Sequence, residues 1–187
     1  MGAGPLKSNP PRPEEELLNA ALRLLSVRSR GVEELRGRLL KKGFPPGEVE
    51  NCLKWLEARD LLDDGAFSRA LVRDRVNLSP RGPSLLQQEL WKKGVARATA
   101  EKAVEAIFQD QGVSEGDLAE KAARGWVRRQ GRRAREALVA SPFTEEREKA
   151  RRRLFAFLGR RGFRGEAASR GMEAGEEEAR ILLQDMD

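Results

Sequence analysis

Apolar residues recur along this chain at the three- and four-residue spacing of an amphipathic helix, and one such pattern occurs three times. The segments ELRGRLLKKGF (34–44), LLQQELWKKGV (85–95) and RRRLFAFLGRRGF (151–163) align on a glycine. Each carries two leucines four residues apart, then two basic residues, Gly, and Phe or Val. The pattern predicts a helix that ends at a left-handed glycine, so the chain contains an internal repeat.

Two further helical patterns flank each copy, which makes a unit of three helices. A first helix is expected from Pro13, with an apolar stripe formed by Leu17, Leu18, Ala21, Leu22, Leu24 and Leu25. A third helix is expected after Pro46, with Val49, Cys52, Leu53 and Leu56 facing inward. Their counterparts 51 residues later are Ala100, Ala103, Val104 and Ile107. The second unit therefore repeats the first in register.

Polar residues mark where the remaining helices begin. Asp63 or Asp64 is expected to cap the helix that follows, in which Phe67, Ala70 and Leu71 face inward. Gly82 and Pro83 are expected to start the second short helix, as N-cap and first-turn residues. In the third unit, the expected N-terminal residues are Ser114 with Asp117, and Thr144 with Glu145 and Glu146.

The third unit is longer than the others. Gly94 and Gly162 are separated by 17 residues more than Gly43 and Gly94, and the excess falls around RRQGRRAREALVASPF, which the pattern leaves open as helix or loop. Its third helix is expected to be short, near 166–174. No alternating strand pattern occurs, so the predicted fold is all-α, a tandem array of three three-helix repeats in an elongated, curved molecule. The expected segments are a flexible leader (1–13), repeat 1 (14–62), repeat 2 (63–110), repeat 3 with its Arg-rich insertion (111–174), and an acidic C-terminal tail (175–187).

The order of these segments resembles the RecX family, bacterial regulators of the RecA recombinase. The resemblance covers residues 14–173 and is carried by ALRLLSVRSRGVEELRGRLLKKGF, LLDDGAFSRALVRDRV, RGPSLLQQELWKKGV and EKARRRLFAFLGRRGF. It implies a helical-repeat protein that lies in the groove of the RecA filament on DNA. There it modulates, and mostly inhibits, RecA ATPase, strand exchange and coprotease activity, which affects recombination, DNA repair and the SOS response.

The chain departs from the pattern of that family at three places. Gly31 replaces the usual serine cap, Gly159 stands where the other copies have Leu40 and Trp91, and the third unit carries the Arg-rich insertion. The last two departures concern the geometry of the third unit.

Positive charge is concentrated in the third unit. The net charge is 0 over 14–62, +1 over 63–110 and +7 over 111–173. We expect this surface to bind DNA phosphates or the acidic surface of RecA, since a guanidinium group pairs with phosphate and carboxylate alike. The pattern leaves both ligands open, and a merely solvated helical face is the structural alternative. The candidate residues are Arg124, Arg128, Arg129, Arg132, Arg133, Arg135, Arg151, Arg152, Arg153, Arg160 and Arg161.

Two other functions remain open on the same residues. The chain could bind single- or double-stranded DNA independently of sequence and of RecA, or serve as a helical adaptor for another protein. Structural roles are favoured for the other notable residues. The lysine pairs are expected at helix C-termini, and Asp63 and Asp64 are expected to cap helices instead of binding a metal. The tryptophans are expected to pack between helices, and Cys52 is expected to be a buried thiol.

Catalysis has little support in the composition. The chain contains no histidine and no Walker or dinucleotide-binding glycine motif, so we expect no enzyme, cofactor or metal site. No run of about 18 apolar residues predicts a membrane span. The N-terminus lacks the apolar block of a secretory signal, and the chain has a single cysteine. These features favour a cytoplasmic protein, and we expect a monomer.

Overall fold

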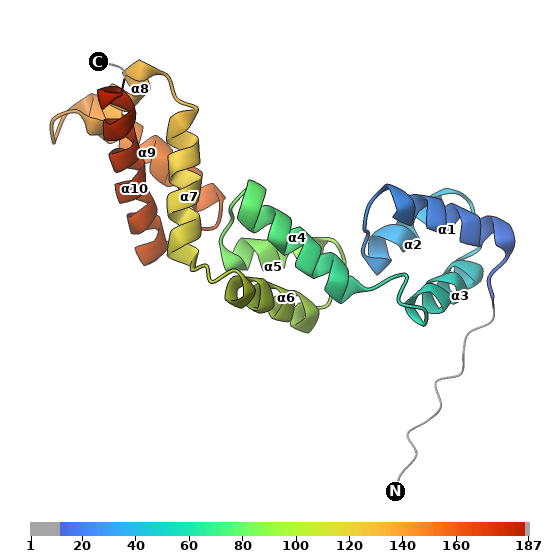
Figure 1. Ribbon diagram of the computed structural model, residues 1–187. Coiled ribbons are helices and arrows are strands. Elements are labelled where there is room, and N and C mark those ends of the chain that lie inside the picture. Colours follow the sequence, from blue (N-terminus) through green and yellow to red (C-terminus); the bar gives the residue numbers. More distant parts are fainter. Residues whose placement is uncertain (1–11, 186–187) are drawn as a thin grey trace, which may run out of the picture. The chain divides into compact units, whose positions relative to one another are not determined.

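The structure is a computed structural model that describes residues 12–185, and in that range α-helices joined by turns and loops are the only regular elements (Figure 1). This confirms the predicted fold class. The expected leader over 1–13 lies almost wholly outside the described residues. The helices are α1 (Glu15–Val27), α2 (Val32–Lys41), α3 (Pro46–Glu57), α4 (Asp64–Leu78), α5 (Pro83–Lys92), α6 (Arg97–Asp110), α7 (Glu115–Arg128), α8 (Arg132–Val139), α9 (Glu145–Arg160) and α10 (Gly165–Gln184).

The helices are distributed over two compact units. The first holds the chain up to Ala70 together with Glu89–Ala103, and the second holds Leu71–Gln88 together with Val104–Asp187. Helices α1, α2 and α3 therefore belong to the first unit, and α7, α8, α9 and α10 to the second. Helices α4, α5 and α6 contribute residues to both.

The three copies of the repeated segment adopt the same helix end. Gly43, Gly94 and Gly162 have φ angles of 91°, 85° and 85°, as the pattern predicted. The amide of the following residue donates to the carbonyl oxygen of the second leucine, at 3.4 Å in the first copy and 3.1 Å in the other two. This is the Schellman arrangement, which satisfies carbonyls that a helix end leaves free. The leucines it positions are all fully buried: Leu35, Leu39, Leu86, Leu90, Leu154 and Leu158.

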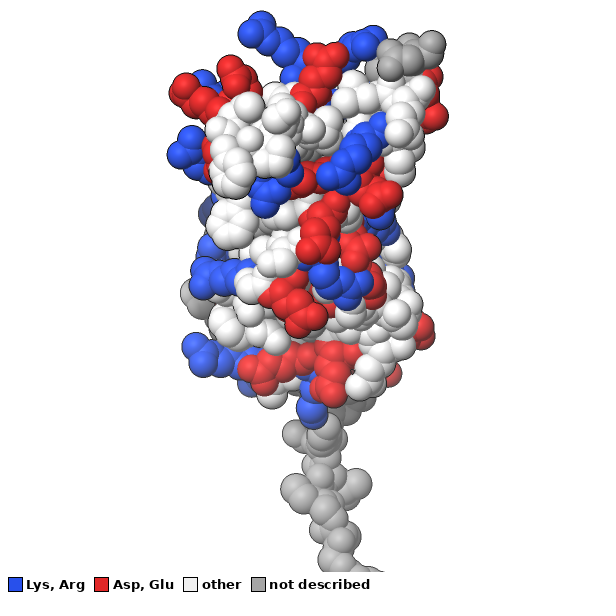
Figure 2. All heavy atoms as spheres, turned by 90° about the vertical axis from the view of Figure 1, so that its left-hand side faces the viewer, with Lys and Arg blue, Asp and Glu red and all other residues white. Residues whose placement is uncertain are grey.

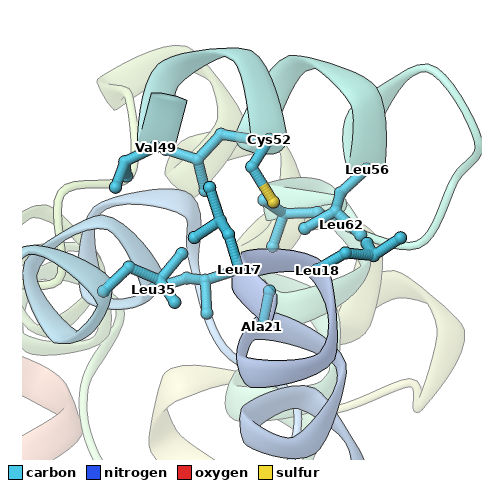
Figure 3. Packing of buried hydrophobic residues seen from close by; sticks show 10 residues of the cluster. Leu17, Leu18, Ala21, Leu35, Val49, Cys52, Leu56 and Leu62 are labelled. Carbon is cyan, nitrogen blue, oxygen red and sulfur yellow. The ribbon is translucent and has the colours of Figure 1, made fainter. Parts of the chain in front are cut away.

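The core of the first unit lies between α1, α2 and α3. Figure 3 shows Leu17, Leu18 and Ala21 of α1 facing Val49 and Cys52 of α3, all of them buried. Because the apolar positions follow the helical period, each helix contributes one continuous stripe to this core. Two inward assignments were wrong: Leu22 is 38 % exposed, and Ala70 of α4 is exposed while Val72 and Val76 are buried.

Asp63 and Asp64 accept hydrogen bonds from the first turns of two different helices. The Asp63 Oδ1 atom accepts a hydrogen bond from the Gly65 amide at 2.7 Å, which caps α4. The Asp64 Oδ1 atom instead accepts from the Val32 amide at 2.9 Å, at the first turn of α2. Gly31 at the N-cap of α2 has no side chain, and Asp64 provides a side-chain acceptor for the first amide of this helix.

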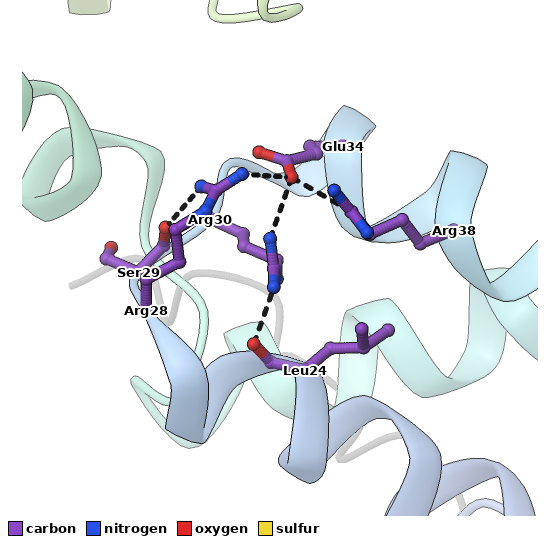
Figure 4. A network of polar contacts seen from close by, with 6 residues as sticks. All are labelled: Leu24, Arg28, Ser29, Arg30, Glu34 and Arg38. Carbon is purple, nitrogen blue, oxygen red and sulfur yellow. Dashed lines mark hydrogen bonds and ion pairs between the residues drawn. The ribbon is translucent and has the colours of Figure 1, made fainter.

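A carboxylate also ties α1 to α2. Glu34 accepts hydrogen bonds from Arg28, Arg30 and Arg38, and Arg30 also donates to the Leu24 carbonyl at 2.9 Å (Figure 4). Burial alone raises the pKa of the Glu34 carboxyl, but the hydrogen bonds from Arg28, Arg38 and Arg30, together with the charge of Arg28, lower the pKa below its usual value. Arg30 is 5 % exposed, so this network stabilises the turn between the helices.

The last four helices differ from the expected third repeat in two ways. The Arg-rich insertion, left open as helix or loop, forms helix α8 over Arg132–Val139. The third helix is not short: α10 runs over Gly165–Gln184, so the expected acidic tail from 175 is helical as far as Gln184. The physical reason is a stripe of small residues at four-residue spacing, which lets α10 pack closely against α7: Ala167, Gly171, Gly175 and Ala179.

Candidate binding surface

The predicted arginines lie on the helices of the second unit. Arg124 and Arg128 belong to α7, Arg132, Arg133 and Arg135 to α8, and Arg151, Arg152, Arg153 and Arg160 to α9. Arg129 and Arg161 directly follow α7 and α9 as C-cap residues. All of these arginines belong to one unit. Some of their side chains form hydrogen bonds or ion pairs within the protein, and the others face solvent.

Glu178 on α10 engages two of the α7 arginines. Its side chain is 6 % exposed; its Oε1 atom lies 2.6 Å from Arg128 Nε, and its Oε2 atom lies 3.3 Å from Arg124 Nη1. The hydrogen bond from Arg128 lowers the pKa of the Glu178 carboxyl, and the same bond raises the pKa of Arg128. These two predicted site residues therefore have an intramolecular partner.

Glu176, two residues before Glu178 on α10, engages a second set of arginines. Its Oε2 atom accepts from Arg147 Nη2 at 3.1 Å, Arg151 donates to its Oε1 atom, and Arg180 lies 3.8 Å away. Figure 2 shows the face of the molecule on the side where α8, α9 and α10 lie in Figure 1, and acidic side chains lie between basic ones there. This face is mixed in charge.

The arginines of α8 are partly engaged as well. Arg132 Nε donates to Glu136 at 2.9 Å on the same helix. Arg135 donates to the carbonyl oxygens of Val127 and Arg128 at the end of α7, at 3.3 and 2.9 Å, and the Val127 carbonyl also accepts from the Gln130 amide. Their roles within the protein are structural.

The remaining α9 arginines line a hollow of about 460 Å³ that we call the Trp126 hollow. Its lining residues are Trp126, Lys149, Arg152, Arg153, Ala156 and Arg160. None of these described residues is acidic, and within residues 12–185 no ion pair involves Lys149, Arg152, Arg153 or Arg160. Lys149 was not among the predicted residues, although its spacing to Arg152 and Arg153 places all three on one stripe of α9.

A second basic hollow of about 240 Å³ lies between the 77–80 segment, α7 and α9, and we call it the Arg161 hollow. Its lining residues are Asn77, Leu78, Ser79, Pro80, Lys121, Ala122, Gly125, Arg128, Arg129, Phe157 and Arg161. Four of these described residues are cationic and none is acidic. The sequence analysis missed Lys121 and Ser79, and no sequence signal connects Ser79 to residues some 80 positions later.

Arg161 is held in this hollow by contacts with the chain before α5. Its Nη1 atom donates to Ser79 Oγ at 2.9 Å and to the Pro80 carbonyl at 3.2 Å, and its guanidinium lies 5.0 Å from the Phe157 ring centre. The Arg161 carbonyl accepts from the Gly82 amide at 2.8 Å. Burial, and then repulsion from Arg81, Arg129 and Arg75, lowers the pKa of Arg161. The local charge is thus unfavourable to a cation and favourable to an anion.

Neither a metal site nor a membrane span is found in the part of the chain that the structure describes. Between residues 12 and 185, no three carboxylate or thiol side chains come together as metal ligands would. None of the described helices is both long enough and apolar enough to cross a bilayer. The chemical groups of this surface are therefore basic and aromatic side chains around two hollows.

Sequence comparisons relate the chain to known proteins. Residues 18–56 match the profile of the first three-helix domain of RecX, and residues 63–104 match that of the second. A Regulatory protein RecX from Halorhodospira halophila is 32 % identical over 164 residues, which is 88 % of this chain and 91 % of that relative. The chain belongs to the RecX family. A RecX relative from Mycobacterium ulcerans is 33 % identical over 85 % of this chain and 84 % of its own.

Other RecX relatives match over a shorter range. The protein from Prosthecochloris aestuarii is 38 % identical over 87 residues, so this chain spans 58 % of the length of that relative. All three of these relatives are named as regulatory proteins.

The fold is also that of solved RecX structures. A crystal structure of RecX from Lactobacillus salivarius superposes with a TM-score of 0.66 over 87 % of this chain and 96 % of that chain, at 20 % identity.

Proposed function

We propose that this RecX-family protein binds the RecA filament on DNA and lowers RecA activity without being an enzyme itself. The observation that carries this proposal is the alignment with a Regulatory protein RecX over 91 % of the length of that relative. The family resemblance supplies the partner, the processes of recombination, repair and SOS response, and the cytoplasm as the place of action. The basic hollows of the second unit support it, because a filament on DNA presents phosphates and acidic side chains.

The mechanism that fits these features is steric. Helical repeats that each bury an apolar stripe against neighbouring helices form a long binding face for another macromolecule. A protein bound along the filament restrains the movements of RecA subunits that accompany ATP turnover. Inhibition then requires binding energy and no catalytic group, which agrees with a chain that contains no histidine.

The test is the DNA-dependent ATPase of the cognate RecA. Purified protein added below the RecA concentration is expected to lower the steady-state rate on single-stranded DNA, and to lower strand exchange and repressor self-cleavage in parallel. A rate that stays unchanged at saturating protein would contradict the proposal.

A second candidate function, DNA binding that is independent of RecA, is favoured by the basic hollows. A salt titration of DNA binding without RecA separates the two. Tight binding with a steep dependence on salt, combined with no effect on RecA, would make DNA the primary ligand.

A further inference from the structure

Ser79 places a hydroxyl group among the cations of the Arg161 hollow. It lies in the non-helical segment 79–82 between α4 and α5, and its Oγ atom accepts a hydrogen bond from Arg161 Nη1 at 2.9 Å. In the part of the chain that the structure describes, no acceptor is found for the proton of this hydroxyl. By contrast, the hydroxyls of Ser68 and Ser169 donate to carbonyl oxygens of their own helices. Ser79 therefore combines an unengaged proton with cationic surroundings.

The Ser79 hydroxyl is within reach of another protein. Ser79 is half-buried, and the two residues before it, Asn77 and Leu78, are exposed. Leu78 is 82 % exposed, so an enzyme that approaches the hydroxyl meets a large apolar side chain beside it. Irregular segments at the surface are where other proteins most often bind a chain. The position is therefore accessible to a modifying enzyme.

The charge of the hollow matches that of a phosphate monoester. Arg128 is paired with Glu178. The other lining cations have no carboxylate partner among the described residues: Lys121, Arg129 and Arg161. Helices α4, α7 and α9 end at this hollow, and each helix end contributes roughly half a negative charge, which leaves about one and a half positive charges. A phosphoserine carries a charge of about −1.5 to −2 at neutral pH, whereas each phosphodiester of a nucleic acid carries about −1. The monoester is the better electrostatic match.

The hollow also has room for the group. Its volume of about 240 Å³ is several times the roughly 30 Å³ of one water molecule in the liquid, and phosphorylation adds one phosphorus and three oxygen atoms. A phosphate opposite arginines forms one to three charge-assisted hydrogen bonds. In the unmodified protein, burial and then repulsion from neighbouring arginines lower the pKa of Arg161. A phosphate on Ser79 would offset that repulsion.

We propose that Ser79 is a phosphorylation site whose phosphate monoester is held in the Arg161 hollow by Arg129 and Arg161. The Ser79 Oγ atom attacks the terminal phosphorus of a nucleoside triphosphate bound to a serine kinase. An O–P bond forms, the bond from that phosphorus to the bridging oxygen breaks, the nucleoside diphosphate leaves, and the hydroxyl proton passes to a base of the kinase. For its effect, this modification rests on the proposed function: it neutralises the hollow and so weakens binding to the filament.

The first experiment uses the full chain with phosphoserine incorporated at Ser79, without RecA. A phosphorus NMR titration should place the second pKa of the phosphate at about 5 or below, instead of the usual value of about 6, because nearby cations favour the dianion. At neutral pH the Tm should lie roughly 3–6 °C above that of the unmodified protein, the shift expected for one charge-assisted hydrogen bond in a chain of this size. A second pKa near 6 together with an unchanged Tm would show that the phosphate stays in solvent, and the site would be wrong.

The matched control is phosphoserine at Ser141, which is also followed by a proline and lies in the same unit. Ser141 is exposed and lines neither basic hollow, and the acidic residues Glu145 and Glu146 begin the next helix. Its phosphate should keep a second pKa near the usual value of about 6. Equal second pKa values at Ser79 and Ser141 would remove the role of the hollow.

Arg129→Ala tests the phosphate contact itself. Arg129 is exposed and has no carboxylate partner among the described residues, so the substitution should leave the Tm of the unmodified protein close to that of the parent. In the protein phosphorylated on Ser79, the same substitution should remove part of the gain in Tm and raise the second pKa of the phosphate. Identical effects in the two backgrounds would contradict the contact.

Mass spectrometry tests whether the modification occurs. The protein is isolated from cells of the organism that encodes it, grown with and without DNA damage, and digested with trypsin. The peptide VNLSPR, residues 76–81, should carry a phosphate on Ser79 in at least one of the two cultures. A peptide that is unphosphorylated in both cultures would overturn the assignment.

The RecA ATPase separates this proposal from the proposed function. The protein phosphorylated on Ser79 should need roughly tenfold more material for half-maximal inhibition than the unmodified protein, as for one lost charge-assisted contact. Ser79→Ala removes the hydroxyl without adding charge and should inhibit like the parent. Equal inhibition by the phosphorylated and unmodified forms would overturn the regulatory effect alone. Unmodified protein that leaves the ATPase unchanged would overturn the proposed function, whereas the NMR and Tm results for the phosphate site would stand.

Discussion

Replacing Gly175 of α10 by alanine tests the close packing of α7, α9 and α10. A Cβ atom at Gly175 would lie 2.7 Å from Leu154 Cδ2 and 3.5 Å from Ala123 Cβ, and Leu154 is fully buried. Alanine inside a helix is worth about 1 kcal/mol over glycine, but overpacking a core costs about 1–3 kcal/mol. We therefore expect Gly175→Ala to destabilise the second unit by up to about 2 kcal/mol, the difference of those two ranges.

The control for this substitution is Gly159→Ala in α9. A Cβ atom at Gly159 meets nothing within 4 Å, so only the helix-propensity gain of about 1 kcal/mol applies. Thermal unfolding followed by far-UV circular dichroism should place Gly159→Ala above the parent and Gly175→Ala at or below it. The two variants should differ by about 1–3 kcal/mol, or roughly 2–12 °C, since 1 kcal/mol shifts Tm by about 2–4 °C in a chain of this size. A Gly175→Ala protein as stable as Gly159→Ala would refute the packing of α10.

Three further changes follow from single contacts. Asp64→Ala should destabilise the first unit by about 1 kcal/mol in urea unfolding, because the Val32 amide loses its acceptor at 2.9 Å; an unchanged midpoint would show that Asp64 does not cap α2. Glu178→Gln should cost about 1 kcal/mol at neutral pH. The pKa of Glu178 in the folded protein lies below the usual 4.5, so the stability difference between the parent and Glu178→Gln is full above pH 4.5. This difference should shrink as the pH falls through the lower folded pKa. A stability difference that does not change with pH would contradict the ion pair. Burial raises the pKa of the Cys52 thiol to about 11, so a thiol reagent at pH 8 should label it only in denaturant, and fast labelling of folded protein would show that the thiol is accessible.

The repeated glycine segment was predictable because its determinants are local. A left-handed glycine and two leucines four residues apart define the helix end and the buried stripe within one segment, so the φ angles of Gly43, Gly94 and Gly162 matched the pattern. Gly159 shows why one departure from the family pattern is harmless. The equivalent Leu40 is 39 % exposed, so this position lies at the surface and needs no large side chain.

The charge pattern was predictable only in part, because pairing depends on helices far apart in the sequence. The residue count placed the positive excess in the third unit, but treating 175–187 as a tail hid Glu176 and Glu178 as buried partners of its arginines. The hydrogen bond from Arg128 to Glu178 spans 50 residues, which no local pattern reveals. The small residues at four-residue spacing from Ala167 to Ala179 were the available signal for a packed helix.

Helix geometry then decides which arginines remain for a partner. Consecutive residues on α9 point about 100° apart, so Arg151 reaches Glu176 while Arg152 and Arg153 turn toward Trp126. Of these three arginines, Arg151 is thus engaged within the protein, whereas Arg152 and Arg153 form no ion pair among the described residues. Reversing the charge of the whole run would disturb both at once, whereas Arg153→Ala leaves the contacts of Glu176 in place. Variants that replace one arginine on one face of α9, and not the whole run, can thus separate an effect on nucleic-acid binding from an effect on the stability of the second unit.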